Sequence, residues 1–378
     1  MFVKSNIVAV HLFNDFSGSP KVLSTVIKNL VKRGYEVDLI TSGGSEGALS
    51  LLPVNYKWIT YRFFQSGGVR LMAYFWSQLI IFMKIWAYPP SSVTVYVNTL
   101  LPFGAAIAAR LRKQHLVYHL HETSLKPLLL KRFLKWVVSC CADHVIYVSH
   151  FLAKEERIEG VPGHVAYNAL SAEFINKAKP GAKKKGVFNV LMLCSLKAYK
   201  GVEEFISLCN KLPHLRFELV LNADREIIDS YFKERNLPKN LFIYSSQKDV
   251  TPFYRRANLV LNLSKPDQWK ETFGLTLLEG MQYGLPVIAP PAGGPCEIVV
   301  SSLNGYLIHP SNQPKLIEAI HRLSVDRELY QSMSHQALRT ASSFTEKAMM
   351  RPILKCLKES ENKLDMERYF DEIKTGAC

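Results

Sequence analysis

The sequence predicts an α/β protein with two doubly wound domains, each a parallel sheet covered by helices on both faces. Short apolar runs rich in Val, Ile, Leu and Tyr alternate with helical patterns along most of the 378 residues. A basic stretch without apolar periodicity, "NKAKPGAKKKG" (176–186), interrupts this alternation near the middle. We therefore expect a first domain over 1–175, a second over 187–345, and a helical segment over 346–378 that packs back on the first domain.

Strands and helices are expected to alternate in order along both halves. In the first half, strands are expected over 6–13, 35–42, 93–98, 115–120 and 143–149, and helices over 21–32, 103–112 and 126–141. In the second half, strands are expected over 187–196, 215–222, 240–246, 257–264 and 285–290, and a mainly helical region over 313–372. The carboxyl ends of both sheets would then face a central cleft, where ligands of open α/β sheets bind.

No segment is expected to cross a membrane or to be removed as a signal peptide. The most apolar stretch, "LMAYFWSQLIIFMKIW" from Leu71 to Trp86, falls short of the roughly 20 residues that span a bilayer, and Lys84 interrupts it. We expect a helix that is buried against a sheet or lies at an interface. The seven cysteines are odd in number and include no CxxC pair, so a reducing compartment such as the cytoplasm fits better than a disulfide framework or a zinc site.

Basic residues exceed acidic ones by 47 − 32 = 15, which indicates an anionic partner. A phosphorylated small molecule, an acidic membrane surface and a nucleic acid all have the required charge, and a merely solvated surface is the alternative. Nucleic acid is disfavoured because the sequence has no recognised nucleic-acid-binding motif. We expect peripheral contact with the anionic inner face of the cytoplasmic membrane.

Two glutamates frame the start of a predicted helix in "KETFGLTLLEGMQYGLPVIAPPAGG" (270–294). Thr272 is expected to cap this helix, whose free amides form a positive end suited to phosphate. Eight residues at a helical rise would place Glu271 and Glu279 roughly 12 Å apart, which is comparable to the separation of the two ends of a nucleoside diphosphate sugar. The alternative is that both are ordinary exposed glutamates.

This stretch resembles the signature of the retaining GT-B glycosyltransferases of family 4, of the bacterial surface-polysaccharide type. Four further features match that family: the Gly-Leu-Pro-Val-Ile strand, the Gly293-Gly294-Pro295-x-Glu297 turn, "NGYLI" (304–308) and "KGVEEFISLCNKLP" (200–213). The resemblance runs from "DFSGSP" to about Phe344 and is stronger in the second domain. It implies a GT-B fold, with two Rossmann-like domains facing a central cleft. It also implies transfer of a hexose-type unit from a nucleotide diphosphate sugar with retained configuration, without a cofactor or a metal.

The resemblance assigns roles to residues of the second domain. Glu271 would hold hydroxyls of the donor sugar, and Glu279 would hold the ribose. Four backbone amides would bind the sugar and phosphates, those of Phe273, Gly274, Leu275 and Thr276. Lys200, at the start of a helix, is chemically suited to stabilise the departing diphosphate. Many family members have an arginine five residues earlier, where this chain has Ser195, so Lys197 is the candidate substitute.

In the first domain, Gly18 follows the first strand in "DFSGSP" (15–20), and the resemblance implies that its amide approaches the donor phosphate or the acceptor. His119 and His121 alternate at the end of a strand, so both point to one face. By resemblance His121 is the active-site histidine beside the donor sugar, whereas His119 is expected to pack in the core. No third ligand of suitable spacing follows them, so no metal is expected. Neither G-x-G-x-x-G nor G-x-x-x-x-G-K-[ST] occurs, which argues against a dehydrogenase or an NTPase.

We therefore expect an enzyme that extends a lipid-linked glycan, as in lipopolysaccharide or capsule assembly. Lys200 and the helix amides would stabilise the departing diphosphate, while the acceptor hydroxyl attacks from the same face of the sugar. Two alternatives are a synthase of the sucrose-phosphate or trehalose type, with a soluble sugar acceptor, and a catalytically silent nucleotide-sugar-binding or scaffold subunit.

Overall fold

The chain divides into two compact units in the computed structural model. Unit 1 consists of Met1–Tyr167 together with the segment that begins at Lys347, and unit 2 consists of Asn168–Glu346. The residues that the structure describes are 6–44, 46–61, 67–178 and 186–359. Most of the linker expected over 176–186 lies outside them.

The division between the units differs slightly from the one that the sequence suggested at 175. Helix α6 (Ala172–Lys177) belongs to unit 2. Its Phe174 packs edge-on against Tyr254 and Tyr283 of that unit, with ring centroids 6.0 and 5.7 Å apart. Such edge-to-face pairs add to the stabilisation from apolar burial.

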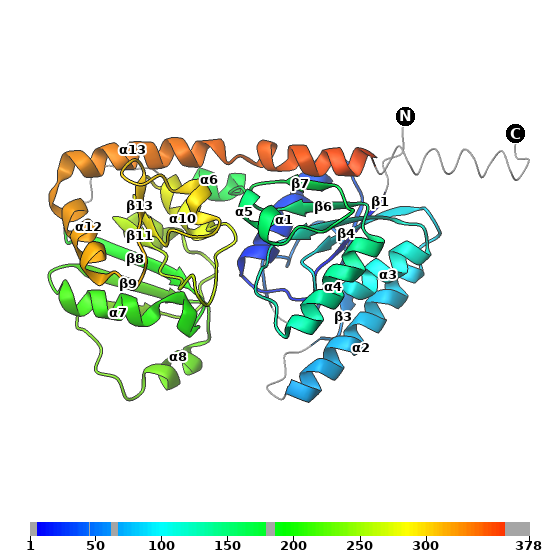
Figure 1. The fold of residues 1–378 in the computed structure, drawn as a ribbon, viewed down its shortest axis with the longest axis horizontal. Helices are drawn as coiled ribbons and strands as arrows, with labels where there is room; N and C mark the ends of the chain where they lie inside the picture. The colour runs from blue at the N-terminus through cyan, green and yellow to red at the C-terminus, as the bar shows by residue number, and fades with distance from the viewer. Residues whose placement is uncertain (1–5, 45, 62–66, 179–185, 360–378) are drawn as a thin grey trace, which may run out of the picture. The chain divides into compact units, whose positions relative to one another are not determined.

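Unit 1 is built on a seven-stranded parallel sheet with the strand order β3-β2-β1-β4-β5-β6-β7 (Figure 1). The strands are β1 (Asn6–Val10), β2 (Val37–Ser42), β3 (Asn55–Ile59), β4 (Val93–Asn98), β5 (His115–Leu120), β6 (His144–Tyr147) and β7 (Gly163–Val165). The inner strands are buried runs of Val, Ile, Leu and Ala, as parallel strands covered on both faces require. The sequence did not predict the two edge strands, because β3 is largely exposed and β7 has only three residues.

Helices cover both faces of this sheet. They are α1 (Gly18–Lys32), α2 (Gly67–Trp86), α3 (Phe103–Leu111), α4 (Leu128–Cys141) and α5 (His150–Glu155), and residues 346–359 are also helical. Helix α1 begins three residues earlier than the expected 21–32. The Asp15 carboxylate accepts the Ser17 amide N–H at 2.9 Å, and Pro20 fits the first turn, where an N–H would have no helical partner.

Unit 2 has a six-stranded parallel sheet with the order β10-β9-β8-β11-β12-β13. Its strands are β8 (Asn189–Cys194), β9 (Arg216–Leu221), β10 (Leu241–Tyr244), β11 (Leu259–Leu261), β12 (Val287–Ala289) and β13 (Gly305–Leu307). Its other helices are η1 (Ala198–Lys200), α7 (Val202–Lys211), α8 (Arg225–Phe232), α9 (Thr251–Arg256), α10 (Leu275–Gln282), α11 (Pro295–Ile298), α12 (Gln313–Val325) and α13 (Arg327–Ser343).

Helices α7 and α10 lie on opposite faces of this second sheet (Figure 1). Phe205 of α7 packs in one core with Leu259 and Leu261. On the other face, Gly280 of α10 approaches Val260 so closely that a Cβ on the glycine would lie 2.6 Å from the valine side chain.

Both sheets change direction beside their first strand, between β1 and β4 and between β8 and β11. Chain connections run away from each other at such a point, and a crevice opens at the carboxyl ends of the strands. The two doubly wound parallel sheets confirm the predicted α/β fold. Within the part of the chain that the structure describes, no helix is long and apolar enough to cross a membrane.

Candidate functional site

Three loops meet at the carboxyl edge of the sheet of unit 2. They follow three adjacent strands: η1 comes after β8, the segment 262–274 after β11, and the Gly293–Gly294 turn after β12. Because neighbouring parallel strands end at one edge, these loops bring together residues that are far apart in the sequence.

Lys200 and Glu271, both predicted site residues, form an ion pair. Lys200 Nζ donates to Glu271 Oε2 over 2.8 Å, and the two side chains are 14% and 22% exposed. Trp269 lies against the cation, with its ring centroid 5.2 Å from Nζ, and stacks on Tyr199. Burial raises the pKa of Glu271, but the charge and hydrogen bond of Lys200 and a hydrogen bond from Asn262 outweigh it, so this pKa lies below its ordinary value. Glu271 is therefore an anion held beside a fixed cation.

The sequence did not single out Tyr199, Asn262 or Trp269. Each lies in a loop that carries a predicted residue, "SLKAYKG" or "NLSKPDQWKE", and that proximity was the available signal. No sequence signal predicts the stacking of Tyr199 on Trp269, because it depends on how two loops fold over neighbouring strands.

Two glycines support the loop that carries Glu271. The amide of Gly294 donates to the carbonyl oxygen of Glu271 over 2.8 Å. A Cβ on Gly294 would lie 2.2 Å from the carbonyl oxygen of Thr272, and one on Gly293 would lie 2.3 Å from that of Glu271. Gly293 also has a φ of +78°, which favours glycine. The two backbones can approach this closely only because neither residue has a side chain.

The helix after Glu271 begins later than predicted. The N-cap of α10 is Gly274, with φ +103°, and no side chain caps it. The prediction that Thr272 caps this helix is therefore wrong, since the left-handed turn at Gly274 separates that residue from the first helical turn. The helical rise applies only from Leu275 onward, so the distance of roughly 12 Å between the glutamates also lacks its basis.

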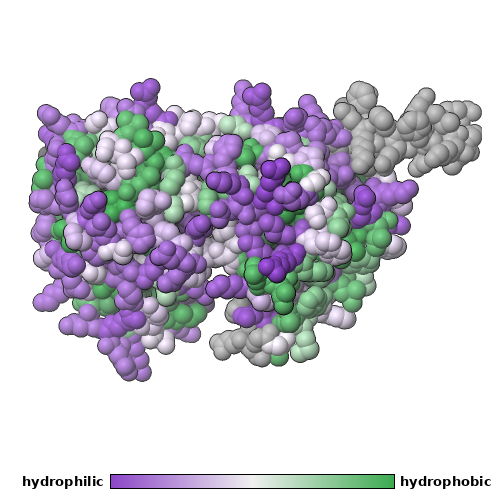
Figure 2. Space-filling model, in the orientation of Figure 1, coloured by the Kyte–Doolittle hydropathy of each residue, from purple (hydrophilic) through white to green (hydrophobic). Residues whose placement is uncertain are grey.

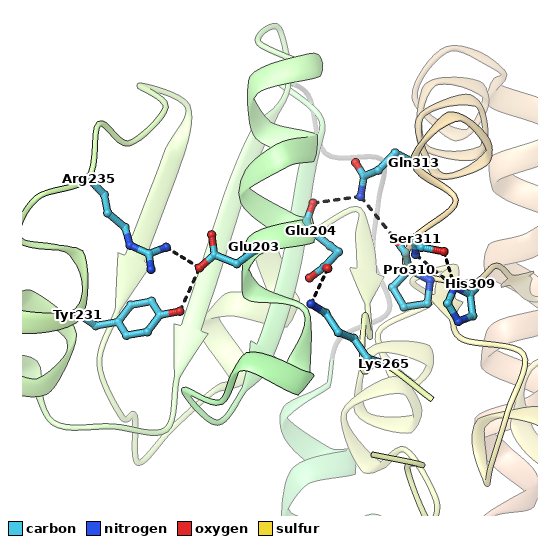
Figure 3. A network of polar contacts seen from close by, with 9 residues as sticks. All are labelled: Glu203, Glu204, Tyr231, Arg235, Lys265, His309, Pro310, Ser311 and Gln313. Carbon is cyan, nitrogen blue, oxygen red and sulfur yellow. Dashed lines mark hydrogen bonds and ion pairs between the residues drawn. The ribbon is translucent and has the colours of Figure 1, made fainter. Parts of the chain in front are cut away.

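The first turns of α7 and α10 differ in charge. Helix α7 begins with Glu203 and Glu204, whereas the first turn of α10 has no acidic residue. Figure 3 shows Glu204 paired with Lys265 at 2.7 Å and Glu203 paired with Arg235. Carboxylates thus already occupy the positive end of α7, and they would repel a phosphate. The free amides at the start of α10 offer the better anion site in unit 2.

This difference modifies the prediction for Lys200. Lys200 is the last residue of η1 and precedes α7. Its ammonium group, and not the amides of α7, is therefore the group that could bind a phosphate. Ser195 follows β8 directly, and Lys197 is exposed two residues later, at the start of η1. The positions of Ser195 and Lys197 do not by themselves assign either residue a role in donor binding.

Of the four amides predicted to bind the donor, two start α10 and two precede it. Leu275 and Thr276 are its first residues, whereas Phe273 is buried ahead of the cap, Gly274. Only amides of a first turn point freely along the helix axis. Leu275 and Thr276 are therefore the better placed pair.

Glu279 lies in α10 and is 4% exposed, so it is not the surface residue of the alternative interpretation. Tyr254 of α9 donates its hydroxyl to Glu279 Oε2 over 2.6 Å, and also reaches the carbonyl oxygen of Thr276 at 3.3 Å. Nearly buried carboxylates need such partners. Tyr254 was missed by sequence reasoning, and the ribose role of Glu279 stays a prediction.

In unit 1, His121 follows β5 at the carboxyl edge and joins a polar chain with Asn98 and His11. His121 Nε2 lies 2.8 Å from Asn98 Oδ1, and Asn98 Nδ2 lies 3.0 Å from His11 Nδ1. An amide oxygen only accepts, so His121 carries its proton on Nε2 and its Nδ1 has a free lone pair. Burial lowers the pKa of His121 well below its ordinary value, and the neighbouring His119 and His11 lower it further.

His119 and His121 point to one face, as predicted, with ring centroids 4.4 Å apart. His119 is fully buried, Tyr96 contacts its Nδ1 at 2.8 Å, and burial lowers its pKa to about 3. Among the described residues, the one grouping with the spacing of metal ligands is His144, His164 and Cys356, near β6 and β7, and it does not include His121.

Glu122 was missed by the sequence analysis, although it directly follows His121. Its carboxylate accepts the amides of Leu100 at 2.9 Å and His121 at 3.1 Å. Burial raises its pKa to about 7, although these backbone bonds act in the opposite direction. Gly18, the remaining predicted residue, is the exposed first residue of α1 rather than a loop residue, and a Cβ there would meet nothing within 4 Å.

The fold and the site together define the class of protein. Two Rossmann-like units that carry polar groups at the carboxyl ends of their strands are typical of GT-B glycosyltransferases. Residues 16–174 match the family model "Glycosyltransferase Family 4", and residues 173–340 match "Glycosyl transferases group 1". Together the two models match residues 16–340, so the chain is one of the glycosyltransferases that they describe. Its fold is the GT-B fold.

The individual proteins that resemble this chain match only part of it or have low sequence identity to it. A probable sucrose-phosphate synthase of Oryza sativa is 32% identical over 128 residues, which are 33% of this chain and 12% of that protein. The match thus spans only about an eighth of the relative's length. HepE of Anabaena, solved with UDP and glucose, has a TM-score of 0.76 at 20% identity and covers 94% of this chain and 99% of its own. A sucrose-phosphate synthase of Thermosynechococcus elongatus has a TM-score of 0.70 at 17% identity and covers 99% and 100%.

Proposed function

We propose that the chain transfers a sugar from a nucleotide diphosphate sugar to a hydroxyl of a carbohydrate acceptor, with retained configuration and without a metal. The observation that carries the proposal is the Lys200–Glu271 pair close to the start of α10. A diphosphate requires positive charge, and a sugar requires acceptors for its hydroxyls. The pair and the α10 amides offer both. The complex of HepE with UDP-glucose supports the same class of donor.

In the proposed reaction, the bond between the anomeric carbon and the diphosphate oxygen breaks, and negative charge grows on that oxygen. Lys200 and the amides of Leu275 and Thr276 would stabilise this charge more in the transition state than in the ground state. Glu271, kept ionised by Lys200, would accept sugar hydroxyls. The acceptor oxygen then bonds to the same face of the anomeric carbon, and its proton passes to the departing diphosphate. The neutral His121 offers Nδ1 to a substrate hydroxyl.

For the acceptor, the relatives among the sucrose-phosphate synthases and a structural neighbour that is a trehalose 6-phosphate synthase favour a soluble sugar. They favour it over the lipid-linked, surface-polysaccharide glycan that the sequence suggested. A lipid-linked glycan is the second candidate, because one observation supports it: helices α2 and α4 present large apolar side chains to solvent. Peripheral membrane contact belongs to this second candidate.

The test begins with donor binding and then follows turnover. The purified chain is titrated with UDP-, GDP- and dTDP-sugars, and the shift of its thermal midpoint is recorded. The donor that binds is incubated with soluble sugars and sugar phosphates, or with a lipid-linked glycan in vesicles, and released nucleoside diphosphate is measured. Release with one acceptor class identifies it. Binding without release under either condition would favour the silent scaffold subunit, and no binding of any donor would refute the proposal.

A further inference from the structure

Helix α2 is apolar on its outward face as well as on part of its inward face, where Tyr74, Ile81 and Ile85 are buried. Its inward face carries Ser77 and Gln78, which are 0% and 2% exposed. The Gln78 side chain accepts the amide of Gly104 in α3 at 3.1 Å, and Ser77 donates to the carbonyl oxygen of Tyr74 at 2.6 Å. The outward face is a stripe of large apolar residues at helical spacing: Met72, Phe75, Trp76, Leu79, Met83 and Trp86. A helix that only covered a sheet would present polar residues to solvent on its outward face.

Helix α4 presents a second apolar stripe, with Leu129, Phe133 and Trp136 at 76%, 37% and 62% exposure. Aromatic contacts join the two stripes through α3. Phe103 of α3 lies 5.9 Å from Phe75 and 5.3 Å from Phe133, measured between ring centroids. We call the joined surface the α2–α4 face. Its members are Met72, Phe75, Trp76, Leu79, Met83, Trp86, Leu128, Leu129, Phe133 and Trp136.

Figure 2 shows this face as the largest green area of unit 1, at the lower right, over α2 and α4. Single exposed apolar residues need no explanation, but a contiguous group of this kind marks an interaction surface. Three of the five tryptophans of the chain lie in it. Tryptophan is the residue most typical of the boundary between lipid and water.

Basic residues predominate around the face, although Glu156 pairs with Lys131 and Lys135 of α4. Glu122 is the single acidic residue of the sequence between positions 47 and 142. Residues 67–142 contain nine basic ones: Arg70, Lys84, Arg110, Arg112, Lys113, Lys126, Lys131, Arg132 and Lys135. Of these, Arg70, Lys126 and Arg132 are exposed beside the apolar stripes, and Arg112 stacks on Trp86 at 5.1 Å. An anionic surface is the complementary partner.

We propose that the α2–α4 face docks unit 1 onto an anionic lipid bilayer, with α2 and α4 lying in the plane of the interface. The apolar stripes would enter the boundary between head groups and acyl chains, while the basic rim meets lipid phosphates. Both terms are needed, since neither apolar helices nor a basic patch alone binds a membrane firmly. A second copy of the chain would bring the exposed Arg70, Lys126 and Arg132 against the same basic residues of its partner, so this charge favours lipid over self-association. The proposal rests on unit 1 and does not depend on the donor chemistry.

The experiment is sedimentation of the full chain with vesicles. Phosphatidylcholine vesicles with and without about 30% phosphatidylglycerol are compared, because the anionic lipid supplies the surface charge. The wild type should bind the anionic vesicles and lose most binding as salt rises. Trp76→Ser/Trp136→Ser should lower the partition coefficient at least tenfold. The matched control, Ile227→Ser/Val325→Ser, removes two equally exposed apolar side chains from unit 2 and should bind as the wild type does.

Further readouts separate the outcomes. Lys126→Gln/Arg132→Gln should weaken binding to anionic vesicles and leave the small binding to neutral ones unchanged. Thermal midpoints and donor-binding curves of all variants check that the fold and the donor site persist. Equal sedimentation of the wild type and the double-tryptophan variant would overturn the proposal. So would a wild type that ignores vesicles but forms a dimer that the same variant abolishes, because the face would then be a protein interface.

Discussion

At the residue scale, the donor site that we propose in unit 2 depends on the pairing of Lys200 with Glu271. The resemblance implied separate roles for the two residues: Lys200 would bind the diphosphate and Glu271 would bind hydroxyls of the sugar. The structure joins them by a 2.8 Å bond, with the carboxylate ionised by its partner. A change at either residue therefore alters the other, and single variants report on the pair.

The first prediction concerns Lys200→Ala. With Ser195 in place of an arginine, Lys200 is the principal cation expected at the departing diphosphate, so turnover should fall on the order of 10²-fold, with a smaller loss of donor affinity. Lys197→Ala, which changes an exposed lysine nearby, is the matched control and should stay within about twofold. Ser195→Arg should tighten nucleotide binding, because it adds a bidentate phosphate donor. Turnover and donor affinity of all three variants are measured, and normal turnover of Lys200→Ala together with a slow Lys197→Ala would reverse the assignment.

The second prediction separates two roles of Glu279. The carboxylate accepts the Tyr254 hydroxyl, and it is also the predicted partner of the ribose. Tyr254→Phe and Glu279→Ala both break the internal bond, which costs about 1–3 kcal/mol when a buried partner is left unsatisfied. Only Glu279→Ala removes a ribose acceptor, so it should weaken donor binding about tenfold or more while Tyr254→Phe stays near the wild type. Equal donor affinities for the two variants would show that Glu279 is structural.

The third prediction concerns the pH dependence of stability. Burial raises the pKa of Glu122 from its ordinary value of 4.5 to about 7, so the folded state binds this proton more tightly than the unfolded state. Its contribution is fully present below about pH 4.5 and is lost as pH rises through about 7, amounting to roughly 2–3 kcal/mol. Glu122→Gln should therefore gain stability relative to the wild type between about pH 5 and pH 8.

Thermal unfolding of the wild type and Glu122→Gln at both pH values gives the difference directly. Comparing the two proteins cancels the titration of the buried histidines. Glu159→Gln, which changes an exposed glutamate of the same unit, should follow the wild type at both pH values. A difference that stays constant with pH would mean that Glu122 is ionised in the folded protein throughout this range.

At the element scale, the strands of both sheets were largely predictable, because buried parallel strands are uninterrupted apolar runs. What the sequence could not give was the behaviour of segments whose neighbours decide their state. Helix α2 was expected to be buried or interfacial, and only its packing on α3 shows that Ser77 and Gln78 face inward. The prediction of a cap at Thr272 was wrong because Gly274 adopts a left-handed φ of +103° and the helix begins only after it.

The fourth prediction tests how the Gly293–Gly294 turn supports the site. Gly294→Ala would bring a Cβ to 2.2 Å from the carbonyl oxygen of Thr272, so the loop bearing Glu271 must move. Because positioned groups lose function when displaced by about 1 Å, donor affinity should fall at least tenfold. Gly68→Ala, at an exposed position of α2 where a Cβ meets nothing within 4 Å, is the control. Donor titration of both variants checks this, and unchanged affinity in Gly294→Ala would mean that the loop is dispensable for binding.

At the scale of the whole molecule, the net charge of +15 is unevenly distributed. In unit 2, Lys200 and Lys265 are each neutralised by a carboxylate. In unit 1, helices α2, α3 and α4 contain no acidic residue, although Glu156 pairs with Lys131 and Lys135 of α4. The sequence suggested both a phosphorylated ligand and a membrane from the same net charge. We propose that these two attractions belong to different surfaces, so their salt dependence should differ: strong for exposed residues of α2 and α4, weak for the partly buried Lys200.

The last prediction is that sugar transfer does not need a divalent cation. Metal-dependent transferases neutralise the leaving diphosphate with a bound ion, whereas here Lys200 and the amides at the start of α10 supply positive charge at fixed positions. Activity with excess EDTA should therefore stay within about twofold of the untreated enzyme, because amide dipoles and an ammonium group are unaffected by chelation. The comparison includes Lys200→Ala with and without Mg²⁺ or Mn²⁺. If the wild type loses activity in EDTA and regains it with either ion, a metal shares the diphosphate with Lys200. If only the Lys200→Ala variant gains activity from added ion, the cation replaces the missing ammonium group, and the role of Lys200 is supported from a second direction.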